Sequence, residues 1–95
     1  NTSGSKDLTR QNLLGEIFPN PAKSITCIPV SCAEAQQLDI SIIDVFGKPV
    51  KQIFNGKQIQ GESKYFFDAS QLVSGNYFVK IIGEHGSEVK LVLVQ

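Results

Sequence analysis

The amino-acid sequence predicts an all-β domain, and three observations support this. Apolar and polar residues alternate with a period of two, most clearly over Leu38–Ile42. Gly, Pro, Asn and Asp interrupt the alternation at short intervals, as turns between short strands do. Apolar residues at helical spacing are absent beyond the first dozen residues. Together these patterns are typical of an antiparallel β-sandwich of about seven strands.

Length and charge limit the possibilities further. A chain of 95 residues is the size of one domain with a single hydrophobic core. Nine basic and nine acidic residues cancel without forming a run of one sign, so we expect no nucleic-acid partner. The apolar runs are too short for a membrane span, so we expect no membrane insertion. The first residue is not Met and no signal-peptide pattern follows, so we expect a piece of a longer precursor.

The first part of the chain is predicted to be a linker followed by a short strand. Residues 1–12 are mostly polar and without period, which predicts a linker or a disordered segment, and residues 13–95 are predicted to form the folded domain. Gly15–Phe18 is the first expected strand. Pro19 and Pro21 end it, since proline cannot donate a ladder hydrogen bond.

Three strands and a hairpin follow. Ser24–Val30 is the second expected strand, and Leu38–Ile42 the third. Gly47-Lys48 reverses the chain, and Val50–Phe54 returns as the fourth strand, which predicts a β-hairpin.

The rest of the chain is expected to complete the sandwich. Phe67 is the aromatic residue most expected to point inward from the fifth strand. A polar excursion is expected at residues 55–61 and a crossing loop at Gln71–Asn76, and Gly83–Gly86 is the expected turn. The fifth, sixth and seventh strands are expected at Lys64–Asp68, Asn76–Ile82 and Glu88–Val94.

The two cysteines leave two alternatives open. Cys27 and Cys32 match no zinc spacing. Five residues of regular strand span about 17 Å, whereas the Cα atoms of a disulfide lie about 5.5 Å apart. A disulfide would therefore require the chain to reverse near Pro29, and buried free thiols are the favoured alternative.

The sequence is poor in groups that could carry out chemistry. His85 is the single histidine and lies between Glu84 and Gly86, where a solvated turn is expected. Asp44 and Asp68 each end a strand before a turn, so we expect their carboxylates to accept backbone N–H bonds there. We expect no enzyme activity, no catalytic residue, no metal site and no cofactor.

Tyr77 is predicted to clamp a crossing connection. It lies two residues after Gly75 and five after Leu72, the arrangement of a tyrosine corner in Greek-key sandwiches. The ring should pack inward while the hydroxyl bonds to the preceding loop. This makes a Greek-key β-sandwich the expected fold.

Two groups of side chains suggest surface contacts. Lys80 and Lys90 lie on strands between apolar neighbours, where they would protect exposed strands or dock a partner. Tyr65 lies in the aromatic run Tyr65-Phe66-Phe67 and could stack on sugar rings. An immunoglobulin-like or fibronectin-like accessory module that binds carbohydrate beside a catalytic domain is therefore an alternative function.

Three motifs occur in an order that resembles a known family. The first is an aromatic residue followed by Pro-Asn-Pro, the second a strand ending in Asp with Gly-Lys and Val beyond it, and the third Asp, Leu and Gly before Tyr and an alternating strand. They comprise Phe18, Pro19, Asn20 and Pro21; Asp44, Gly47, Lys48 and Val50; and Asp68, Leu72, Gly75, Tyr77, Val79 and Ile81. From Ile17 to Gln95 the chain resembles the type IX secretion system C-terminal sorting domain, also described as the Por secretion system type A sorting domain family.

The resemblance implies a sorting signal with an immunoglobulin-like fold and no chemistry of its own. Such a domain directs an N-terminal cargo domain of the same precursor through the periplasm and across the outer membrane, so the product is secreted or displayed on the cell surface. The implied partners are the type IX translocation machinery and a sortase-like surface peptidase. That peptidase would cut in or upstream of residues 1–16.

The resemblance and the strand pattern together suggest where recognition occurs. The final strand, Glu88–Val94, could pair with a partner by β-augmentation, with Lys80, Lys90, Val92 and Val94 as contact residues beside the three motifs. Family members often end in basic residues, whereas this chain ends in Leu91–Gln95.

Overall fold

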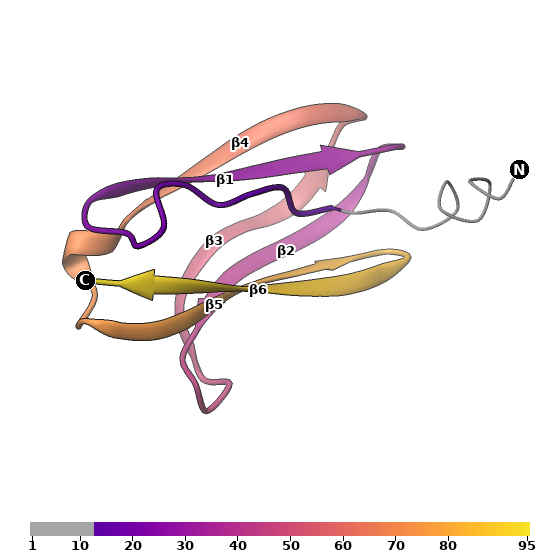
Figure 1. Cartoon of the computed structure of the whole chain (residues 1–95). Helices are drawn as coiled ribbons and strands as arrows, with labels where there is room; N and C mark the ends of the chain where they lie inside the picture. The colour runs from indigo at the N-terminus through magenta and orange to yellow at the C-terminus, as the bar shows by residue number, and fades with distance from the viewer. Residues whose placement is uncertain (1–12) are drawn as a thin grey trace, which may run out of the picture.

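The computed structural model describes residues 13–95, which form two packed β-sheets (Figure 1). One sheet has four strands in the order β3-β2-β5-β6, and the other pairs β1 with β4. The elements are β1 (Ile25–Cys32), β2 (Gln36–Ile43), β3 (Pro49–Gln58), β4 (Gly61–Asp68), the short 3₁₀ helix η1 (Ala69–Gln71), β5 (Gly75–Gly83) and β6 (Gly86–Val94). The linker predicted for residues 1–12 lies outside the described residues.

The order of the strands confirms the predicted antiparallel, Greek-key sandwich. Neighbouring strands are antiparallel in both sheets. The chain changes sheet between β1 and β2, between β3 and β4, and between β4 and β5. As a result β2 lies between its hairpin partner β3 and the distant strand β5, where Ile40 faces Ile81.

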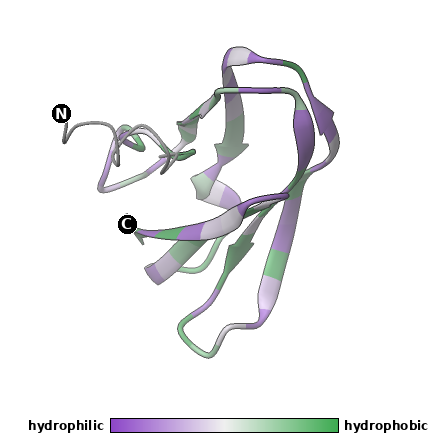
Figure 2. Ribbon diagram, turned by 90° about the vertical axis from the view of Figure 1, so that its right-hand side faces the viewer, coloured by the Kyte–Doolittle hydropathy of each residue, from purple (hydrophilic) through white to green (hydrophobic). Residues whose placement is uncertain are grey.

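The core forms where the inner faces of the two sheets meet. Along β2 buried residues alternate with more exposed ones, as the period of two predicts. Figure 2 shows hydrophobic and hydrophilic segments interspersed along the ribbon. The largest fully buried apolar side chains come from β1, β2, β5 and β6, namely Ile28, Val30, Leu38, Ile40, Ile42, Val79, Ile81, Val92 and Val94.

Three predicted element boundaries were wrong, the smallest difference being that β4 begins at Gly61 and not at Lys64. Gly15–Phe18 lies along β1 but is no regular strand, because its contacts are the separate bridges Leu14–Val30 and Phe18–Cys27. The polar excursion predicted for residues 55–61 belongs mostly to β3, which continues to Gln58 and leaves a short turn. Pairing with β2 supplies hydrogen-bond partners for this polar backbone, so a polar composition did not end the strand.

The two cysteines are buried free thiols, as the sequence favoured. Both lie on β1, which runs straight through Pro29 in continuous register with β4. Cys32 faces the core, whereas Cys27 lies on the outer face between Phe18 and Phe66, its neighbours across the strands.

Gly83 is a position where a side chain would disturb the packing. A Cβ atom there would lie 2.5 Å from Oε1 of Gln36 and 3.2 Å from Cδ1 of Leu13. Gln36 is 1% exposed, and its Oε1 accepts a hydrogen bond of 3.1 Å from the backbone N–H of Glu84. The Gln36 side chain therefore cannot move away without losing this bond.

We expect Gly83→Ala to destabilise the domain by about 1–3 kcal/mol, the usual cost of overpacking a core. Gly56→Ala is the matched control, because the nearest atom to its new Cβ, Cζ of the half-buried Phe54 ring, would lie 3.3 Å away instead of 2.5 Å. Urea denaturation measures both. Equal stability of the two variants would contradict the packing described for Gly83.

Candidate recognition site

The first sequence motif lies against the last strand of the domain. The Asn20 side chain accepts a hydrogen bond from the Leu93 N–H (3.0 Å) and donates one to the Leu91 carbonyl (3.2 Å). Ala22 continues the contact, since its N–H donates to Leu93 O at 2.7 Å and its carbonyl accepts from Gln95 N–H at 2.9 Å. The Pro-Asn-Pro motif thus covers the outer edge of β6 near its end.

The beginning of the same segment is held by two charged side chains of β6. The two oxygens of the Glu88 carboxylate accept from the N–H groups of Leu13 (2.6 Å) and Leu14 (2.9 Å). The Lys90 ammonium donates to the carbonyl of Gly15 at 3.1 Å. Both side chains are half-buried, so Lys90 is not a freely solvated charge.

The opposite side of the segment is bonded to β1. Gly15 N–H donates to Pro29 O at 2.9 Å, and Ser31 N–H donates to Leu13 O at 2.9 Å. Phe18 and Cys27 exchange two further backbone bonds. Residues 13–22 therefore connect the edge of the small sheet to the edge of the large one, and we call them the N-terminal clasp (Figure 1).

Sequence reasoning missed the role of the clasp. Asn20 belonged to a recognised motif, but its partners lie more than 70 residues away along the chain. Glu88 was not singled out at all. One signal was available: Glu88 and Lys90 share the inward register of Val92 and Val94, where a charge requires a partner.

The second motif builds the tip of the β2–β3 hairpin. One Asp44 carboxylate oxygen accepts from the N–H groups of Phe46 and Lys48, each at 2.9 Å. Gly47 takes a φ of 84°, which glycine adopts without strain. The predicted role of Asp44 as a turn acceptor is confirmed.

The third motif forms the connection from β4 to β5. Asp68 Oδ1 accepts from the N–H of Ser70 at 3.0 Å and so caps η1. The Tyr77 hydroxyl donates to the carbonyl of Val73 at 2.5 Å, with the ring buried, which confirms the predicted tyrosine corner. Leu72 packs partly buried against the core, and Gly75 begins β5.

The candidate contact residues on the last two strands point in two directions. Val92 and Val94 are buried in the core. Lys80, by contrast, lies in β5 opposite Val89 of β6, on the outer face of the large sheet. The outer side of β6 exposes the apolar side chains of Val89, Leu91 and Leu93.

The aromatic run does not form the expected Tyr65 platform. Tyr65 is half-buried, its ring centroid lies 4.9 Å from that of Phe54, and its hydroxyl donates to Gln58. Phe67 is buried, as predicted, and Phe66 is exposed on the outer face of the small sheet. Strand alternation placed Tyr65 on the inner face together with Phe67.

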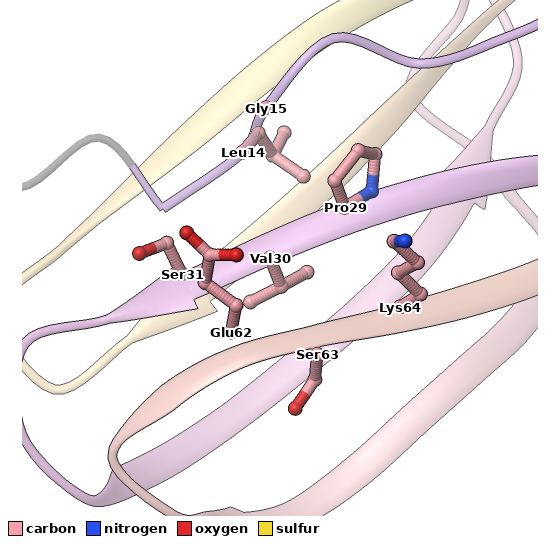
Figure 3. A pocket seen from close by; sticks show the side chains of 8 residues that line it. All are labelled: Leu14, Gly15, Pro29, Val30, Ser31, Glu62, Ser63 and Lys64. Carbon is pink, nitrogen blue, oxygen red and sulfur yellow. The ribbon is translucent and has the colours of Figure 1, made fainter.

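A groove of about 580 Å³ opens on the outer face of the small sheet, beside the clasp (Figure 3). Glu62 and Lys64 of β4 contribute one charge of each sign. The other lining residues are Leu14, Gly15, Pro29, Val30, Ser31 and Ser63. The groove contains neither His nor Cys among its lining residues.

The remaining candidate groups do not converge. His85 is exposed in the turn between β5 and β6, and its Nε2 lies 2.8 Å from the Glu34 carboxylate. Within residues 13–95, no three His, Cys, Asp or Glu side chains are arranged to hold a metal ion. The same residues include no helix that is long and apolar enough to cross a membrane.

The fold and its surface define an immunoglobulin-like β-sandwich module. The family model described as the secretion system C-terminal sorting domain matches residues 16–95, which is nearly the whole described domain. The chain belongs to this family and is a type IX secretion sorting signal, which implies export of its cargo across the outer membrane to the cell surface or the medium. Neither the curated proteins nor the solved structures provided a match.

We expect Tyr77→Phe to lower the free energy of unfolding by about 1 kcal/mol, because it removes the hydroxyl bond to Val73 while keeping the packed ring. For a domain of this size the melting temperature should fall by about 4–8 °C. Phe46→Ala is the control, since Phe46 is 91% exposed and its loss should leave stability unchanged. A Tyr77→Phe domain as stable as wild type would contradict the clamping role.

Stability should also depend on pH in the alkaline range. Burial raises the pKa of the Cys32 thiol above its ordinary 9.0, and burial together with nearby Cys32 raises the pKa of Tyr65 above its ordinary 10.0. The unfolded chain therefore loses these protons at lower pH than the folded chain, so stability is fully present below pH 9 and declines above it.

Urea denaturation of the reduced protein at pH 7.5 and at pH 10 measures this dependence. Replacing both groups, in Cys32→Val with Tyr65→Phe, should reduce the alkaline loss. Stability that rises between the two pH values, or a loss unchanged in the double variant, would contradict the assignment.

Proposed function

We propose that residues 13–95 form a folded sorting signal that the type IX translocation machinery recognises. Residues 1–12 would link this signal to an N-terminal cargo domain. The observation that carries this proposal is the family match over residues 16–95. The motif residues support recognition of a folded shape. Asp44 and Asp68 bond within their own turns, and Tyr77 within its own loop, so these side chains build the domain's outline.

We propose that the outer edge and outer face of β6 make the contact. The carbonyl of Leu91 and both backbone groups of Leu93 point away from β5, toward the free edge. Asn20 and Ala22 occupy that edge from Leu91 to Gln95. The stretch from Ser87 to Leu91 is left for a partner strand, and the neighbouring Lys80 and exposed valine and leucine side chains would supply specificity.

We further propose that a sortase-like surface peptidase removes the domain by cutting before Leu13. Peptidases bind their substrates as extended, unpaired backbone, as strand-adding partners do. The backbone of Leu13, Leu14 and Gly15 is already bonded to β1 and β6. Because a bonded backbone is not available to a peptidase, we expect the processing site in the part of the chain that precedes the clasp.

One observation favours a second candidate, carbohydrate binding. Phe18, Cys27 and Phe66 form one row across the outer face of the small sheet, and the two rings at its ends are about half exposed. Exposed aromatic faces can stack on sugar rings. Glycan-array binding that Phe66→Ala abolishes would support this function, and an array without signal would reject it.

The export test places residues 1–95 behind a periplasmic reporter in hosts with and without the type IX machinery. We expect the reporter outside the cells only where the machinery is present, with a new end upstream of Leu13 in its mass spectrum. Retention in the periplasm of both hosts would refute the proposed function. An intact fusion on the surface would refute the processing step alone.

A point variant tests the edge of β6 more sharply than a truncation, because deleting residues 90–95 would also remove the buried Val92 and Val94. Leu91→Pro removes an N–H that points to the free edge, where proline is tolerated in strands. We expect export to fall several-fold for Leu91→Pro relative to Leu91→Ala. Equal export of the two variants would reject β-augmentation at this edge.

A further inference from the structure

The N-terminal clasp is bonded to the sandwich differently from the six regular strands. It touches β1 and β6 through separate bridges at Leu14, Phe18 and Ala22. Side chains supply many of its other bonds, from Glu88, Lys90 and Asn20. A segment held by isolated bridges can open without unfolding the strands beneath it, since local opening costs less than global unfolding.

Opening the clasp would uncover a slot between β1 and β6. The clasp buries Leu13, Leu14 and Ile17 to between 3% and 4% exposure and Ala22 completely. Its removal would leave an apolar channel along the core. The same removal would leave Pro29 O, Ser31 N–H and both Cys27 groups unpaired on one wall, and Leu93 O and Gln95 N–H on the other.

The slot also contains two charged side chains, Glu88 and Lys90, that bond to the backbone of the segment lying in it. The Glu88 carboxylate accepts from the N–H groups of Leu13 and Leu14, and Lys90 donates to the carbonyl of Gly15. Bonds of this kind to charged groups are stronger than neutral ones. Because successive N–H groups of a regular strand point to opposite sides, the two that bond to Glu88 specify a local bend where the bound segment begins. None of these bonds depends on the identity of that segment's side chains.

We propose that the clasp is exchangeable, and that a partner's extended strand can replace residues 13–22 in the slot between β1 and β6. The fitting partner is a segment with apolar side chains at the positions of Leu14 and Ile17, and with free N–H groups at the position facing Glu88. An exchange of this kind regains the bonds and burial that it breaks, which is how donor strands complete other sandwiches.

Exchange of the clasp would give a partner access to the part of the β6 edge that the clasp covers. Simple addition of a strand reaches the edge only as far as the N–H of Leu91, because Asn20 and Ala22 cover the edge from the Leu91 carbonyl onward. A partner that displaces the clasp would gain the whole edge of β6 and that of β1. The biological partner in this proposal rests on the proposed sorting function, whereas the exchange itself is a property of the purified chain.

Hydrogen exchange on the purified 95-residue chain measures the opening. The amides of Gly15, Ser31 and Gln95 donate across the clasp contacts. We expect them to exchange at least roughly tenfold faster than the amides of β2 and β5, with little dependence on urea. Glu88→Gln should accelerate them about a further tenfold, because the charged acceptor becomes neutral.

Lys51→Gln is the control for this variant, because Lys51 is an exposed charge on β3, at the opposite edge of the large sheet from β6. It should leave the three amides unchanged. Equal protection of the clasp and of β2 and β5 in the wild type would overturn the proposal, because the clasp would then open only with global unfolding.

Peptide binding measures the replacement itself. The probe is a fluorescent peptide with the sequence of residues 13–22. Ile17→Ala in the chain weakens the resident clasp but not the slot, so the variant should bind the probe at least roughly thirtyfold more tightly than the wild type does. A probe carrying Leu14→Asp and Ile17→Asp should not bind.

Two further variants keep this test decisive. Asn20→Ala removes two bonds from an exposed side chain and should give a smaller, several-fold gain if Ile17→Ala fails to fold. Phe46→Ala, at the distant hairpin tip, should give none. Absent binding to folded variants, or equal binding of the mismatched probe, would overturn the proposal. Neither result bears on the reporter's export, so the two hypotheses fail separately.

Discussion

The closure of the sandwich between β1 and β6 is the constraint on which the rest of the structure depends. Two sheets packed face to face leave a gap at each side, and buried apolar and backbone groups at that gap must be covered. Residues 13–22 cover it, with Leu14 and Ile17 in the core and bonds to both sheets. The last strand can contain Val92 and Val94 fully buried at a sheet edge only because this segment lies beside it.

This closure joins the two ends of the domain. The segment that follows the linker predicted for residues 1–12 is bonded to the C-terminal strand through Glu88, Lys90 and Asn20. Different roles in sorting are proposed for these two ends: the first would lead to the cargo, and the last would meet the machinery. Any event that pulls on the start of the domain therefore acts directly on the edge of β6.

The second and third family motifs have a common physical role in this chain. Both are located where the chain changes direction: Asp44 and Gly47 at a hairpin tip, Asp68 at η1, and Tyr77 beside the crossing loop. Such residues specify turns and connections, which set the register of the strands.

The alternation of apolar and polar residues was sufficient to predict an all-β sandwich, the hairpin after Ile42, the inward Phe67 and the tyrosine corner, because these depend on local period and turn chemistry. The same alternation places Tyr65 on the inner face with Phe67, two residues further along the strand. Two features could not be predicted in that way. The extension of β3 through Asn55 depends on pairing with β2. The partners of Glu88 and Lys90 lie about 75 residues away in sequence, and only packing of the two sheets brings them together.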